Sequence, residues 1–182
     1  GAKVELDDHR SEGTPLPDTV QFLGKLRPQQ QRAFEALTAH DTGVLAATTA
    51  FGKTVVASAL IGHRARNTLV LVHRRELLDQ WVERLKSFLQ IDVKLIGAIG
   101  GGKRKPTGVI DVALIQSLVR NGEVDDIVAD YGQLIVDECH HLSAASFELV
   151  ARRSKARFVV GLSATVARKD GHHPIIFMQC GP

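Results

Sequence analysis

Cysteine is scarce in this sequence. Its 182 residues include two cysteines, Cys139 and Cys180, and these do not form a Cys-x-x-Cys pair. That spacing argues against a disulfide framework and against a structural zinc site built on paired cysteines. It fits a protein of a reducing compartment, so we expect an intracellular, cytoplasmic location.

Long hydrophobic runs are also missing. The apolar runs at residues 69–72 and 158–162 are far shorter than the roughly 20 residues that a membrane-spanning helix needs. No signal-peptide pattern opens the chain, and we expect no membrane partner. Charge of one sign is in small excess only. The formal net charge of +3 permits a nucleic-acid partner without requiring one.

Apolar residues as a class are plentiful. They make up 44% of the chain, which is enough for a sizeable core in one compact domain. Residues 1–24 are the exception, because Asp, Glu, Pro, Thr and Gly dominate there, and they predict an extended arm or linker. Residues 25–182 are expected to form the folded lobe.

From residue 26 onward, short apolar runs alternate with longer amphipathic stretches. We expect helices at 28–39, 53–65, 76–89 and 144–153, and strands at 44–47, 68–72, 93–96, 109–114, 134–136 and 158–162. This alternation is typical of an α/β fold. The prediction is a doubly wound, mainly parallel sheet of about six or seven strands with helices on both faces. Residues 100–105, with three glycines and three basic residues, predict a flexible loop that is either a solvated hairpin tip or a phosphate grip.

The segment at residues 47–54 reads Ala-Thr-Thr-Ala-Phe-Gly-Lys-Thr, between a predicted strand and a predicted helix. It keeps the Gly-Lys-Thr end of a P-loop but has Ala47 where that pattern starts with Gly. Backbone N–H groups and a helix N-terminus converge on phosphate oxygens in this context. Lys53 is expected to reach the β- and γ-phosphates of ATP, and the Thr54 hydroxyl to ligate Mg²⁺. The expected nucleotide-binding residues here are Thr49, Ala50, Phe51, Gly52, Lys53 and Thr54. A plain turn is the alternative.

Residues 134–138 form an apolar strand that ends in two carboxylates, Asp137 and Glu138. Strand ends in such sheets face the ligand crevice. Asp137 is therefore expected to hold the Mg²⁺ shell opposite Thr54, and Glu138 to orient or deprotonate the attacking water. An acidic turn that stops a strand is the alternative.

Two weaker signals complete the set. Residues 161–165 follow another apolar strand, and the hydroxyls of Ser163 and Thr165 can bond to the acidic segment and sense a γ-phosphate. Gln30, at the start of the helix at 28–39, offers a donor and an acceptor to adenine. Taken alone, a segment such as residues 163–165 is more often a loop without a function, and a single glutamine is more often a surface residue.

The neighbouring histidines and the tryptophan receive structural interpretations. His140 and His141 are adjacent, and neighbouring histidines on one loop rarely face a common ion, so we expect no metal there. Trp81 lies at helical spacing with Leu78 and Leu85, which predicts core packing rather than a platform for base stacking.

Taken together and in their order along the chain, these segments resemble those of superfamily 2 helicases, particularly the branch that holds repair and transcription helicases and restriction-enzyme translocases. The resemblance covers roughly residues 26–171. Residues 48–54 resemble motif I, 72–77 motif Ia, 115–118 the nucleic-acid-contacting segment before motif II, 137–140 the DExH form of motif II, and 163–165 motif III.

The resemblance implies the first RecA-like lobe of a motor that hydrolyses ATP with Mg²⁺ and moves on DNA, with RNA as a second possibility. Lys53, Asp137 and Glu138 are the catalytic residues that it implies, and His140 becomes a relay between the ATP site and motif III. Sugar-phosphate contacts follow for His73, Arg74, Gln116 and Ser117, and such contacts suit cations and short donors.

Two departures qualify the resemblance. Many relatives have Gly where this chain has Ala50, and a Cβ there could crowd the phosphates or forbid a positive φ. The sequence stops at Pro182, before any second RecA-like lobe with its arginine finger, so we expect this chain to bind nucleotide weakly and to hydrolyse it slowly or not at all. We expect the isolated domain to be monomeric. The alternatives are a different P-loop NTPase and a nucleic-acid-binding or scaffolding module that has lost catalysis.

Overall fold

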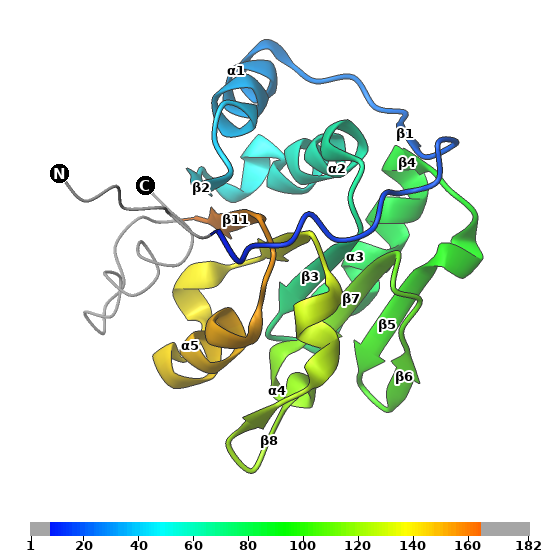
Figure 1. Cartoon of the computed structure of the whole chain (residues 1–182). Coiled ribbons are helices and arrows are strands. Elements are labelled where there is room, and N and C mark those ends of the chain that lie inside the picture. The colour runs from blue at the N-terminus through cyan, green and yellow to red at the C-terminus, as the bar shows by residue number, and fades with distance from the viewer. Residues whose placement is uncertain (1–7, 165–182) are drawn as a thin grey trace, which may run out of the picture.

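The computed structural model of the chain describes residues 8–164, and its centre is a seven-stranded sheet (Figure 1). The strand order is β2-β11-β10-β3-β7-β5-β6. All neighbours in this order pair in parallel except β5 and the edge strand β6. The strands are β2 (Thr42–Ala46), β3 (Thr68–Val72), β5 (Ile96–Gly100), β6 (Lys103–Lys105), β7 (Ile110–Leu114), β10 (Gln133–Val136) and β11 (Phe158–Ser163). The predicted α/β sheet is thereby confirmed.

Helices cover both faces of this sheet. They are α1 (Pro28–Thr38), α2 (Lys53–Arg64), α3 (Arg75–Phe88), α4 (Ile115–Leu118) and α5 (Ala144–Arg153). The four predicted helices are confirmed, and the short α4 was not predicted. Short 3-10 turns lie at η1 (Thr49–Phe51), η2 (Val93–Leu95), η3 (Asp126–Asp130) and η4 (Cys139–His141). Among the described residues, no helix combines the length and the apolar character that crossing a bilayer requires.

The two faces of β3 show how the core is divided. Val70 and Val72 belong to one hydrophobic cluster with residues of α1, α2 and α3, whereas Leu69 and Leu71 belong to a second cluster with residues of α4 and α5. Figure 1 shows these two groups of helices on opposite sides of the sheet. All five residues of β3 are buried. A strand that is covered on both faces has little contact with water, which is why residues 69–72 read as a continuous hydrophobic run. The polar residue of the strand, Thr68, donates its hydroxyl to the carbonyl of Arg66.

One predicted strand lies elsewhere than expected. Residues 93–95 form the turn η2, because the side chain of Asp92 accepts a hydrogen bond from the backbone N–H of Lys94 and caps the turn. The strand β5 starts only at Ile96. After β5 the chain turns back through Gly101 and Gly102, and β6 makes residues 100–105 the tip and returning strand of a hairpin.

The described part of the predicted arm, residues 8–24, is extended but packed on the lobe. It pairs through isolated bridges near the amino ends of β11 and β3, and β1 (Gln21–Phe22) pairs with β4 (Leu89–Gln90). Leu16 and Val20 are buried in the core. Buried side chains and backbone pairing together hold a segment whose composition resembles a linker.

Candidate functional site

The carboxyl ends of β2, β11, β10 and β3 lie side by side, so the segments that follow them meet at one edge of the sheet. Ala46 pairs with Ser163, and the N–H of Ala47 donates to the carbonyl of Ser163 at 2.9 Å. The N–H of Asp137 donates to the carbonyl of Leu71 at 3.0 Å. The structure therefore brings together the P-loop-like segment, the acidic segment and Ser163.

The loop after β2 is shaped by Gly52. This residue has φ 82° and ψ 47°, and it connects η1 to the first turn of α2. A left-handed backbone of this kind favours glycine. The N-terminus of the 12-residue helix α2 therefore faces the sheet edge with its first N–H groups and the positive end of its dipole. Such a terminus is suited to an anion.

Lys53 is buried at the start of α2, and its amine lies inside the loop. The Nζ atom donates to the carbonyls of Ala47 at 2.7 Å and Thr48 at 3.1 Å. Within residues 8–164, the hydrogen bonds of this cation go to two loop carbonyls, at the place where a phosphate would compete for it. Thr54, the next residue, is half-buried in the same helical turn.

Gln30 is placed against this loop and not on the surface, since only 3% of the residue is exposed. Its Nε2 donates to the carbonyl of Phe51 at 2.8 Å, and its Oε1 accepts the N–H of Arg27 at 2.9 Å. The guanidinium of Arg27 also donates to the Phe51 carbonyl, at 2.8 Å. The amide of Gln30 has one further N–H and one further lone pair beyond these two contacts. Sequence reasoning missed Arg27, although it directly precedes the Pro28 that opens the helix.

Ala50 does not have the backbone conformation that its Cβ would oppose. Among the described residues, the non-glycine positions with positive φ are Ala65, Asn121 and Glu138. Ala50 lies in the 3-10 turn η1, so no glycine is required there for backbone reasons. The expectation that its Cβ conflicts with a positive φ is therefore corrected.

Asp137 is nearly buried and both of its carboxylate oxygens accept hydrogen bonds. Oδ2 accepts the indole N–H of Trp81 at 2.7 Å, and Oδ1 accepts the N–H of Glu138 at 2.9 Å. Burial raises the pKa of Asp137 above its ordinary value, and the nearby Glu138 carboxylate adds to the rise, whereas the Trp81 hydrogen bond and the positive charge of Lys53 lower it. A cation placed beside this buried carboxylate would stabilise its ionised form.

Glu138, His140 and Ser163 form a chain of contacts from the acidic segment to the end of β11. The Nε2 atom of His140 lies 3.2 Å from Glu138 Oε2, and its Nδ1 atom lies 2.9 Å from the Ser163 hydroxyl. Glu138 has φ 49°, a left-handed conformation that is unusual for a residue with a side chain. Strain of this kind gathers at functional sites. Thr165 lies outside the described residues.

His140 and His141 both approach the carboxylate of Glu138, at 3.2 and 3.8 Å, and the expectation of no metal there stays a prediction. Ligand atoms of Glu138, His140 and His141 all lie within 4.8 Å of one another. The imidazole rings of His140 and His141 are 4.0 Å apart at their centroids. The 3-10 turn η4 explains this, because it folds the two rings back over Glu138.

The segments predicted to contact nucleic acid also lie together. Gln116, on α4, donates from Nε2 to the carbonyl of His73 at 3.1 Å. Arg74 is exposed directly before α3. Both ring nitrogens of His73 are buried and have no hydrogen-bond partner within the described part of the chain. Burial lowers the pKa of His73, and the charge of Arg74 adds to the decrease.

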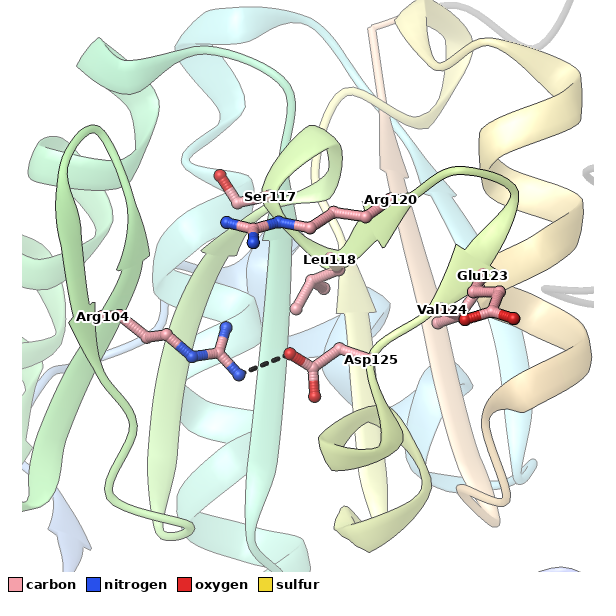
Figure 2. Close-up of a pocket in the computed structure, with 7 residues that line it drawn as sticks. All are labelled: Arg104, Ser117, Leu118, Arg120, Glu123, Val124 and Asp125. Carbon is pink, nitrogen blue, oxygen red and sulfur yellow. Dashed lines mark hydrogen bonds and ion pairs between the residues drawn. The ribbon is translucent and has the colours of Figure 1, made fainter.

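Ser117, the fourth predicted contact, lines a cavity of about 350 Å³ (Figure 2). The cavity lies between the β5–β6 hairpin and the hairpin of β8 (Val119–Arg120) and β9 (Glu123–Val124). Arg104 and Arg120 also line it, and Arg104 forms an ion pair with Asp125. Its walls therefore carry charges of both signs.

The residues at the carboxyl ends of β2, β10 and β11 suit a magnesium nucleotide by their chemistry. A hydroxyl and a carboxylate, from Thr54 and Asp137, are the hard oxygen ligands that Mg²⁺ uses beside phosphate oxygens. The amine of Lys53 and the helix N-terminus suit the phosphates. No acidic residue lies in the first turn of α2 to oppose an anion.

Comparison with known proteins shows that the chain matches a family model and several helicases. A family model described as "Type III restriction enzyme, res subunit" matches residues 23–168. The putative ATP-dependent RNA helicase L396 of Acanthamoeba polyphaga mimivirus is 33% identical over 92% of this chain and 33% of its own length. The DNA 3'-5' translocase XPB2 of Sulfurisphaera tokodaii is 28% identical over 99% of this chain and 39% of its own length. The chain thus spans well under half of each of these relatives.

A solved structure supports the fold. The UvsW helicase of bacteriophage T4 superposes with a TM-score of 0.72 over 88% of this chain and 60% of that chain, at 18% sequence identity. At this identity the likeness concerns the arrangement of the sheet and helices.

Proposed function

The chain belongs to the family described as type III restriction enzyme, res subunit, and has the fold of the first RecA-like lobe of superfamily 2 helicases, and from this premise we propose that it is the ATP-binding lobe of a DNA helicase or translocase. A second lobe, supplied by the remainder of a longer protein, would complete the ATP cleft. We also propose a cytoplasmic location, where ATP is available to such a motor.

The observation that carries this proposal is the convergence at one sheet edge. Lys53 follows β2, Asp137 follows β10, and Ser163 ends β11, and the strands are neighbours in the order β2-β11-β10. The positive charge of Lys53 is close enough to lower the pKa of Asp137. A phosphate-binding cation and a metal-binding carboxylate placed in this way serve one nucleotide.

Each residue has a role in the proposed chemistry. The amine of Lys53 would exchange its loop carbonyls for phosphate oxygens, and Thr54 and Asp137 would hold Mg²⁺, which would supply positive charge to offset that of the phosphates. Glu138 orients the attacking water and accepts its proton. His140 links Glu138 to Ser163, so that a change at the acidic segment reaches β11.

DNA is the proposed track. Four of the relatives are named as DNA 3'-5' translocases or helicases, and one structural neighbour is a SWI2/SNF2 ATPase core from Sulfolobus solfataricus in complex with double-stranded DNA. Arg74, Gln116 and Ser117 would contact the sugar-phosphate backbone, and His73, whose ring nitrogens are buried, would have to turn outward to join them. Binding is then sequence-independent and weakens steeply with salt.

The test is a titration with a fluorescent ADP analogue and Mg²⁺. Wild type should bind, and Lys53→Ala should bind at least about tenfold more weakly, because a charge-assisted contact to phosphate is lost. Lys94→Ala is the matched control: this lysine is exposed on η2, at the amino end of β5 and away from the site. Absence of nucleotide binding in wild type would reject the proposed function and favour a scaffolding module.

A further inference from the structure

Trp81, for which the sequence predicts core packing alone, contacts the segment that carries Asp137. It lies on α3, is 2% exposed, and donates its indole N–H to Asp137 Oδ2 at 2.7 Å. A buried indole N–H needs an acceptor. Here the acceptor is the carboxylate assigned to Mg²⁺, so the contact concerns the nucleotide site as well as the core.

Both oxygens of Asp137 are held from rigid elements. Oδ2 receives the indole, and Oδ1 receives the N–H of Glu138 at 2.9 Å. The N–H of Asp137 itself is tied to the carbonyl of Leu71 in β3. Two donors on opposite oxygens fix the plane of a carboxylate, and each oxygen keeps a lone pair for a further partner. Hydrogen bonds to an ionised acceptor are the stronger ones.

The indole has little freedom to move away. Leu78 and Leu85 lie three positions before and four positions after Trp81 on the same face of α3, and both are buried in the same hydrophobic cluster. Close packing on that face holds the ring in one rotamer. Donors that orient a metal ligand in this way set how well the ligand binds its ion.

Resting on the proposed function, we propose that Trp81 is a positioning residue, which holds the Asp137 carboxylate in the orientation that binds the magnesium nucleotide. A role in packing alone makes a different prediction. Loss of packing lowers the stability of the lobe, but it leaves the gain in nucleotide affinity on adding Mg²⁺ unchanged in the molecules that remain folded.

The experiment removes the N–H and keeps the shape. Trp81 is the only tryptophan of the chain, so biosynthetic replacement of tryptophan by benzothienylalanine changes one position. Affinity for a fluorescent ADP analogue is measured with Mg²⁺ and with EDTA. We expect about tenfold weaker binding with Mg²⁺, from loss of a hydrogen bond to a charged group, and unchanged binding with EDTA. Equal affinity of both forms with Mg²⁺, or an equal loss in both conditions, would overturn the assignment.

Further variants separate position from stability. Trp81→Phe serves as a second form without the donor, and should show the same loss confined to Mg²⁺. Leu85→Val is the matched control, because it removes a buried methylene from the same helix face without touching Asp137; it should lower the melting temperature and keep the Mg²⁺ effect. In an Asp137→Asn background the analogue should have no additional effect, and full additivity would contradict the proposal. If wild type binds no nucleotide in either condition, the proposed function itself fails, and this inference with it.

Discussion

Replacing Gly52 by alanine should destabilise the loop after β2 in two separable ways. The first is backbone strain, because Gly52 has φ +82° and a residue with a Cβ pays about 1–2 kcal/mol in the left-handed region. The second is a collision: the added Cβ would lie 2.6 Å from Nε2 of the buried Gln30. Moving Gln30 breaks its hydrogen bond to Phe51, a loss of about 1 kcal/mol. The total is about 2–3 kcal/mol.

The chain offers a control with a similar φ angle and no collision. Gly102 has φ +83°, and nothing lies within 4 Å of the position that its Cβ would take. Gly102→Ala should therefore show the strain alone, about 1–2 kcal/mol. The difference between the two variants measures what the contact with Gln30 contributes.

Urea unfolding followed by circular dichroism gives both free energies, with an unchanged slope as the sign that the unfolded state is not altered. For a chain of this size, a loss of 2–3 kcal/mol lowers the melting temperature by about 4–12 °C. Gly52→Ala should also weaken Mg-ADP binding, and Gly102→Ala should not. Equal destabilisation by the two variants, with equal nucleotide affinity, would refute the geometry assigned to Gly52 and Gln30.

Three other changes follow from individual contacts. Asp111→Ala removes a buried acceptor of four hydrogen bonds, one of them from the Tyr131 hydroxyl, and should cost about 3 kcal/mol in chemical unfolding; a loss below about 1 kcal/mol would contradict this. Gln116→Ala should weaken binding of labelled duplex DNA in fluorescence anisotropy, and unchanged affinity would remove this residue from the interface. Ser163→Ala takes a partner from His140 and should spare ADP binding but slow phosphate release in a two-lobed protein; normal turnover there would exclude the relay.

Much of the fold could be predicted because the strands are covered on both faces. Residues 69–72 are apolar throughout and are followed by His73 and Arg74, and the strand predicted at 68–72 agrees with β3. The strand expected at 93–96 was wrong for a local reason. Val93 and Leu95 look like strand residues, but Asp92 caps a turn there, and a short polar side chain can divert the backbone wherever hydrophobic periodicity is weak.

The site could be predicted only to the level of strand ends. Parallel strands place the residues that follow them at one edge, and that rule is enough to bring Lys53, Asp137 and Ser163 together. It says nothing about side-chain partners from other elements. Trp81 and Asp137 are 56 positions apart, and helical spacing shows which face of α3 carries the indole but not which atom meets its N–H. The burial of Gln30 against Phe51 was hidden for the same reason.

The strand order gives a physical reason for nucleotide and nucleic acid to influence each other in this lobe. β10, which ends before Asp137, pairs directly with β3, which ends before His73. The backbone N–H of Asp137 bonds to β3 itself, and its carboxylate bonds to the helix that starts two residues after His73. A shift of α3 caused by DNA at His73 or Arg74 would therefore act on Asp137 through one hydrogen bond, without a longer path through the core. Coupling of this kind should be lost when the indole N–H is removed, even if DNA and nucleotide each still bind.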